Sequence, residues 1–115
     1  MKNLSATHVT LWSFAGAAAF EVVTVILRFG FGLESTPCTA STIGVLTGGV
    51  QIHHGYVGFL LLVGAIALWR ANGPVAQRVL IVGSSVFLSD LIHHFLVLWL
   101  AVGDTEFHLM YPSGY

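Results

Sequence analysis

Residues 51–102 read QIHHGYVGFLLLVGAIALWRANGPVAQRVLIVGSSVFLSDLIHHFLVLWLAV. This stretch consists of two long apolar runs on either side of a short polar segment, RANGP at residues 70–74. The Asn-Gly-Pro sequence favours a tight turn, and a short turn of this kind joins antiparallel helices. We therefore predict a helical hairpin, whose two arms decide the fold of the chain.

The composition places the whole chain in a membrane. Of its 115 residues, 56% are hydrophobic and only 8% are charged, whereas soluble domains carry roughly 25% charged residues. An apolar run of about 20 residues crosses a hydrocarbon core of about 30 Å, and the chain holds three such runs. We predict an all-α integral membrane protein with a single domain, 1–115. Its expected parts are a first span at 8–29, an outer loop at 30–50 with a short interfacial helix at 40–46, a second span at 51–69, a third span at 79–102 and a polar outer tail at 103–115.

The charged residues give the predicted bundle a direction across the membrane. Lys2, Arg70 and Arg78 lie on the side of the N-terminus and the hairpin turn, and basic residues favour the cytoplasmic face. The acidic residues of the loop and tail gather at the other side. We therefore expect the N-terminus and the hairpin turn in the cytoplasm, and the loop and the C-terminal tail outside. The acidic residues of the outer side are Glu34, Asp104 and Glu106.

Two adjacent pairs of histidines, His53-His54 and His93-His94, lie inside predicted spans. Ionisable groups within a membrane are costly and usually functional. Both pairs lie about equally far along the chain from the hairpin turn, and equal residue counts on antiparallel helices mean equal depth. Two carboxylic acids come close to the same level, one on the third span and one on the first. The predicted metal ligands are therefore His53, His54, Asp90, His93, His94 and Glu21, with Thr24, Arg28, Glu106 and His108 as accessory residues.

These residue types indicate a transition-metal site. Imidazole binds Zn, Cu, Fe and Ni, and a carboxylate supplies negative charge and a hard oxygen donor. Adjacent histidines on a helix point about 100° apart, so one member of each pair is expected to be a direct ligand. Asp90 could equally be an outer carboxylate that orients an imidazole. Copper, zinc and iron are the expected ions. The reaction stays open between hydrolysis at zinc, oxidation of a lipophilic small molecule at copper or iron, and metal handling without catalysis.

Two short motifs resemble known metal sites. Asp90-x-x-x-His94 followed by His108 resembles the Asp/His/His copper site in the C subunit of membrane-bound methane and ammonia monooxygenases. The string DLIHH, from Asp90 to His94, is similar to the HxxHH box of membrane di-iron desaturases, with Asp in place of the leading His. Both resemblances are local. They imply a metal ion at Asp90 and the histidines near it.

Two other functions stay open. Histidines at equal depth on two helices could bind both faces of a haem b, or a chlorin, in an electron-transfer or pigment protein. The chain could also be a packing subunit of a larger membrane complex, associating through its Gly and Ala faces. Three helices shield buried charge poorly, so we expect a homo-oligomer, for example a trimer. The net charge of −1 argues against a nucleic-acid partner, because phosphate binding requires basic residues.

Overall fold

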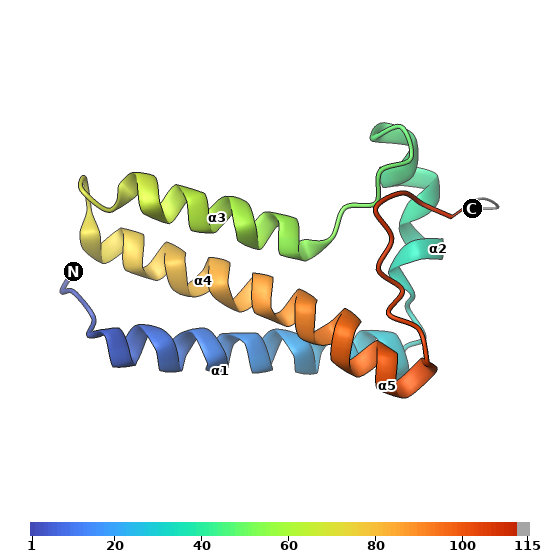
Figure 1. The fold of residues 1–115 in the computed structure, drawn as a ribbon, viewed down its shortest axis with the longest axis horizontal. Helices are drawn as coiled ribbons and strands as arrows, with labels where there is room; N and C mark the ends of the chain where they lie inside the picture. The colour runs from blue at the N-terminus through green and yellow to red at the C-terminus, as the bar shows by residue number, and fades with distance from the viewer. Residues whose placement is uncertain (113–115) are drawn as a thin grey trace.

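Three long helices of the computed structural model lie side by side, with the third in sequence between the other two (Figure 1). The structure describes residues 1–112, apart from the side chain of Ser35. It is helical, as the composition predicts. In chain order the helices are α1 (Ala6–Val25), η1 (Ile26–Gly30), α2 (Ser35–Thr39), η2 (Ala40–Gly44), α3 (His54–Leu68), α4 (Gly73–Ile92), η3 (His93–Leu98) and α5 (Trp99–Val102).

The helix ends follow from capping residues. The side chain of Ser5 accepts a hydrogen bond from the backbone N–H of His8, which caps α1. Asn72 caps α4 in the same way, and Pro74 occupies its first turn, where a missing N–H costs nothing. The third apolar segment therefore becomes helical at residue 73 rather than at the predicted 79. It ends at Gly103, whose φ of +77° gives the left-handed C-terminal cap.

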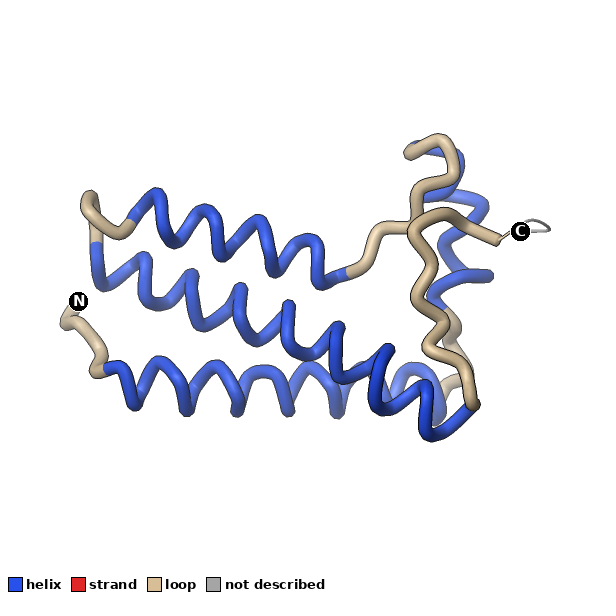
Figure 2. The backbone as a smooth tube through the Cα atoms, viewed as in Figure 1, coloured by secondary structure: helices blue, strands red, loops and turns tan. Residues whose placement is uncertain are grey.

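Helix α4 packs against both α1 and α3, which lie on opposite sides of it (Figure 2). Small residues allow the close approach of α3 and α4. A Cβ atom on Gly58 would lie 2.5 Å from the backbone nitrogen of Phe87 and 2.8 Å from the backbone oxygen of Gly83. Small side chains such as Ala17 and Ala65 are almost fully buried. The hairpin predicted from the Asn-Gly-Pro turn is therefore present, and its two arms are in direct backbone contact.

Two stretches, Ala6–Gly30 and Gly73–Val102, are long and apolar enough to cross a membrane. Their outward faces are apolar: Phe14, for example, is 62% exposed. The remaining long helix, α3, has 15 residues, about 22 Å at 1.5 Å per residue. It begins at His54 rather than at the predicted residue 51, because the preceding residues are extended and the N–H of Gln51 donates to the carbonyl oxygen of Leu109 at 3.0 Å.

The C-terminal tail crosses the open end of the hairpin beside α2 and η2 (Figure 1). The backbone N–H of Tyr111 donates to the carbonyl oxygen of Gly49 at 2.8 Å, and Val50 forms an isolated antiparallel bridge with Met110. The loop predicted at 30–50 is mostly helical, and its helix begins at Ser35 rather than at residue 40. Loop and tail together close the end of the bundle that carries the two histidine pairs.

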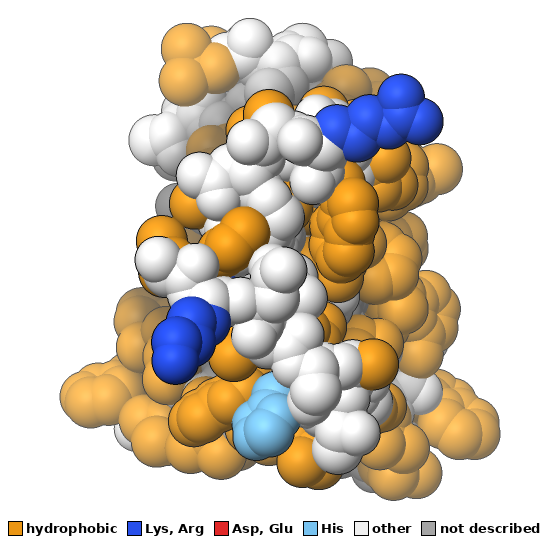
Figure 3. Space-filling model, turned by 90° about the vertical axis from the view of Figure 1, so that its left-hand side faces the viewer, with side chains coloured by type: hydrophobic (Ala, Val, Ile, Leu, Met, Phe, Trp, Pro, Cys, Tyr) orange, Lys and Arg blue, Asp and Glu red, His pale blue; other side chains and the backbone are white. Residues whose placement is uncertain are grey.

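The opposite end of the molecule, with the N-terminus and the α3–α4 turn, shows basic side chains (Figure 3). No acidic side chain is visible on this face of the described residues. A guanidinium nitrogen of Arg78 lies 3.4 Å from the carbonyl oxygen of Lys2, which ties the N-terminal segment to α4. The charge asymmetry read from the sequence therefore corresponds to two ends of the folded chain.

Candidate metal centre

Three buried side chains converge where the outer end of the hairpin meets the tail. His53 precedes α3, Asp90 lies near the end of α4, and His94 lies in η3. One potential ligand atom from each lies within 4.8 Å of the others, and the three residues are only 3–5% exposed. Ligand atoms bound to one ion at about 2.1 Å lie roughly 3.4 Å apart in a tetrahedral site. Small side-chain adjustments would therefore bring all three onto a single ion.

The tail fixes the protonation of both imidazoles of this cluster. The Nδ1 of His94 lies 2.8 Å from the carbonyl oxygen of Thr105, and the Nε2 of His53 lies 2.7 Å from the carbonyl oxygen of His108. A carbonyl oxygen only accepts hydrogen bonds, so each of these nitrogens carries a proton. The lone pairs are left on Nε2 of His94 and Nδ1 of His53. Histidines that bind metals are commonly held in this way by a backbone carbonyl on the second nitrogen.

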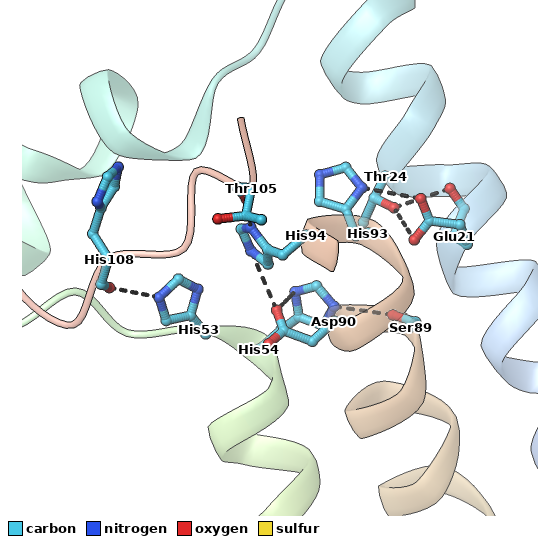
Figure 4. Close-up of polar contacts among 10 residues, drawn as sticks. All are labelled: Glu21, Thr24, His53, His54, Ser89, Asp90, His93, His94, Thr105 and His108. Carbon is cyan, nitrogen blue, oxygen red and sulfur yellow. Dashed lines mark hydrogen bonds and ion pairs between the residues drawn. The ribbon is translucent and has the colours of Figure 1, made fainter. Parts of the chain in front are cut away.

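Asp90 presents an oxygen that lacks a satisfactory partner. Its Oδ1 is buried, and no hydrogen bond of good geometry reaches it from the described residues. Two imidazole nitrogens lie nearby, Nδ1 of His54 at 3.2 Å and Nε2 of His94 at 3.6 Å (Figure 4). Leaving a buried carboxylate oxygen without a hydrogen bond is costly. This oxygen is therefore well suited to bind a cation.

His54 lies beside this cluster but is not one of its three members. Its Nε2 lies 2.9 Å from the hydroxyl oxygen of Ser89, and its Nδ1 faces Asp90. When the Ser89 hydroxyl donates to Nε2, Nδ1 carries the proton and lies close to Oδ1 of Asp90 without forming a hydrogen bond of good geometry. A protonated Nδ1 and an engaged Nε2 favour His53 over His54 as the ligand of the first pair. The sequence did not single out Ser89 as a partner of His54.

Glu21 and His93 form a separate buried pair. Oε1 of Glu21 lies 3.0 Å from Nδ1 of His93, and the Thr24 hydroxyl lies 3.3 Å from the other carboxylate oxygen. The His93 and His94 rings touch edge to face, with centroids 5.4 Å apart. Glu21 and His93 were both predicted as metal ligands. In the structure they pair with each other across the α1–η3 contact, immediately beside the triad of His53, Asp90 and His94.

Arg28 links η1, which continues α1, to the loop and the tail. Its guanidinium forms ion pairs with Glu34 at 2.8 Å and with Glu106 at 2.9 Å. Glu106 has a φ of +49°, a conformation that is uncommon outside glycine. The tail is thus held over the cluster by an ion pair at a strained residue. The side chain of His108 is not part of the triad. Only its backbone oxygen takes part, which the sequence could not indicate.

A cavity of about 300 Å³ adjoins the triad. Histidine, carboxylate and aliphatic side chains all line it. Three of the aliphatic lining residues are also exposed at the surface. The lining residues are Thr24, Leu27, Arg28, Leu33, Glu34, Cys38, Ile52, His53, His54, Asp90, His93, His94, Leu98 and Glu106.

The packing around the histidines favours a single ion over a haem. The rings of His53 and His94 meet edge to face with centroids 4.9 Å apart, and Phe107 stacks on His53 at 4.1 Å. A porphyrin plane has no space between these two rings. The nearby glycines do not provide that space either, because a Cβ on Gly55 would meet the Asp90 carboxylate and one on Gly58 would meet α4.

No protein-family model, curated protein or solved structure matches this chain. The structure agrees in part with the local resemblance to the Asp/His/His copper site. Asp90 and His94 do lie together, but the third group beside them is His53 rather than His108. Among the described residues, the buried cluster of His53, Asp90 and His94 is therefore a group that could hold a metal.

Proposed function

We propose that this chain is an integral membrane protein that binds one transition-metal ion through Nδ1 of His53, Oδ1 of Asp90 and Nε2 of His94. The observation that carries the proposal is that one potential ligand atom from each of these three buried side chains lies within 4.8 Å of the others. Each imidazole is already oriented by a backbone carbonyl. The buried Oδ1 of Asp90 accepts no hydrogen bond of good geometry from the described residues, which further supports a bound cation at this oxygen.

The donor set indicates the type of centre. Two imidazoles and one carboxylate with open positions is the ligand set of mononuclear non-haem iron sites, and zinc accepts the same donors. Three protein ligands leave at least one coordination position for water or another molecule. The cavity beside the triad supplies the space for it. We therefore propose a centre that binds a small molecule at iron, copper or zinc, in preference to a closed structural site.

The membrane placement in this proposal is a three-span bundle with the metal near the outer face. Two stretches are long enough to cross a bilayer by themselves. The third, α3, is shorter than a hydrocarbon core of about 30 Å, and local thinning or tilt of the bilayer accommodates such a mismatch. The basic end of the molecule (Figure 3) favours the cytoplasmic side. The loop, the tail and the metal would then face outward.

We keep homo-oligomerisation as part of the proposal. The homo-oligomer was expected because three helices shield buried charge poorly. Within one chain, however, Glu21 pairs with His93 and Arg28 pairs with two carboxylates. A trimer is therefore not needed to satisfy these charges. Native mass spectrometry in detergent would show whether copies associate.

The metal proposal is tested by elemental analysis and an optical spectrum of one sample purified without chelators. We expect about one transition-metal ion per chain and no Soret band. Asp90→Ala and His94→Ala should each remove most of the metal. His108→Ala is the matched control, because it keeps the backbone carbonyl that binds His53. A metal-free wild-type protein would favour the packing-subunit function, and a Soret band would favour haem.

A second comparison tests the choice within each histidine pair. His53→Ala should lower metal content much more than His54→Ala, since only His53 belongs to the triad. His94→Ala should likewise exceed His93→Ala, because the Nδ1 of His93 is engaged by Glu21. Equal losses within a pair would mean that both members bind metal, and the single-ion geometry proposed here would then be wrong.

A further inference from the structure

The cavity beside the triad has two chemically different parts. The inner part carries the ligand side chains, so an exogenous donor atom entering it would meet the open coordination position of a bound ion. Its outer part is lined by Leu27, Leu33 and Ile52, which are 41%, 50% and 45% exposed. Residues that both line a cavity and face the exterior form its mouth. The mouth is therefore largely aliphatic, although the exposed Cys38 and the side chain of Glu34, which is 45% exposed, also line the cavity.

The charges around the cavity limit what it can hold. Three carboxylates line it, those of Glu34, Asp90 and Glu106, together with the guanidinium of Arg28. The charge of Arg28 is offset by ion pairs with two of these carboxylates, which engage both of its terminal nitrogens and leave only its Nε without a hydrogen-bond partner among the described residues. Once a divalent ion is bound, the three negative charges balance the ion and the guanidinium. A charged ligand would disturb that balance in a largely buried site, where unpaired charge is costly.

The volume of the cavity limits the size of the molecule that it can hold. Pockets for small molecules begin at about 300 Å³, which is the volume found here. The occupant must be small, and most of its surface must be apolar to pass the aliphatic mouth. In the proposed orientation this mouth lies near the outer membrane interface, where amphipathic molecules concentrate.

We propose that the cavity binds a small, uncharged molecule with an apolar body and one lone-pair donor, which enters from the membrane interface and occupies the open position of the metal. This inference rests on the proposed metal site, and it names the class of molecule that the site takes. Uncharged alcohols, amines in their neutral form and nitrogen heterocycles with an alkyl or aryl group belong to this class.

The test uses the full-length protein loaded with Co²⁺, whose visible absorption bands report a change of ligand. Three probes share one donor group: imidazole, 4-phenylimidazole, and imidazole-4-acetate, which carries a negative charge. We expect 4-phenylimidazole to bind about tenfold more tightly than imidazole, because its ring is removed from water by the aliphatic mouth. Imidazole-4-acetate should bind more weakly than imidazole.

One variant tests the aliphatic mouth and another tests the carboxylates around Arg28. Leu33→Ala should lower the affinity for 4-phenylimidazole severalfold and leave the affinity for imidazole unchanged. Leu60→Ala is its control, because Leu60 is 68% exposed and does not line the cavity. Glu34→Gln removes one carboxylate from Arg28 and should raise the affinity for imidazole-4-acetate relative to imidazole.

The outcomes separate this inference from the metal proposal. If the protein takes up no Co²⁺ and gives no visible bands, the metal site itself is wrong. If the bands appear but 4-phenylimidazole binds no more tightly than imidazole, the inference about the cavity is overturned while the metal site stands. The same holds if the charged probe binds as well as imidazole, or if Leu33→Ala and Glu34→Gln act like the Leu60 control.

Discussion

Replacing Gly55 by alanine tests the site through a single added methyl group. Gly55 lies in the first turn of α3, directly against the carboxylate of Asp90. A Cβ at this position would lie 2.5 Å from Oδ2, 2.9 Å from Cγ and 3.0 Å from Cβ of Asp90. Carbon and oxygen atoms in ordinary contact are about 3.5 Å apart. Gly55→Ala must therefore move the carboxylate, or the start of α3, by about 1 Å.

A displacement of this size is large for a metal ligand. Metal–ligand distances are held to about 0.2 Å, so a shift of about 1 Å detaches Asp90 from an ion bound by His53 and His94. Disturbing the orientation of a ligand typically lowers metal affinity 10- to 100-fold, a range we take as the minimum here. Overpacking costs the fold about 1–3 kcal/mol as well, and this cost must be separated from the effect on the metal.

The assay is a competition between the purified protein and a chromophoric zinc chelator, with helix content monitored by circular dichroism on the same samples. Gly64→Ala is the control: it lies on the same helix, and a Cβ there would meet nothing within 4 Å. We expect Gly55→Ala to lose at least tenfold in zinc affinity while keeping its helices, and Gly64→Ala to behave like the wild type. Wild-type affinity in a folded Gly55→Ala protein would refute the placement of Asp90 at the metal.

Three further predictions concern the surroundings of the triad. Phe107→Ala removes the ring stacked on His53 at 4.1 Å and should lower metal affinity severalfold while speeding amide exchange in the tail; unchanged exchange would mean that the stack does not hold the tail. Glu21→Ala leaves a buried nitrogen of His93 without its partner and should cost about 1–3 kcal/mol of stability with little loss of metal, whereas metal loss equal to that of Asp90→Ala would make Glu21 a ligand. Removing the metal with a chelator should increase amide exchange at residues 104–111, because metal and tail carbonyls hold the same two imidazoles; identical exchange with and without metal would separate the tail from the site.

Much of the fold could be predicted from the sequence because it depends on strong local signals. The Asn-Gly-Pro turn and the apolar runs on either side predict the hairpin, and equal residue counts from the turn predict that the histidine pairs meet. The start of α3 was predicted three residues too early. An apolar pattern cannot reveal that Gln51 leaves the helix to pair with Leu109, since that bond depends on a tail more than fifty residues away.

The site was predictable at the level of residue types but not of roles. The sequence predicts that six ionisable residues lie at one level. The structure divides them into the triad, His54 beside it, and the Glu21–His93 pair. Side-chain direction decides this division, and adjacent histidines give no hint of which one turns inward. The two carbonyl oxygens that orient His53 and His94 belong to Thr105 and His108. Every residue carries such an oxygen, so no sequence pattern marks them.

X-ray absorption at the edge of the bound metal tests the central claim most directly. Imidazole rings give a characteristic outer-shell scattering pattern, so their number can be counted. We predict two imidazoles at about 2.0–2.1 Å with an oxygen donor at a similar distance, and one imidazole in the small fraction of metal that His94→Ala retains. A spectrum with no imidazole contribution, or two imidazoles in the metal that His94→Ala retains, would contradict the proposed site.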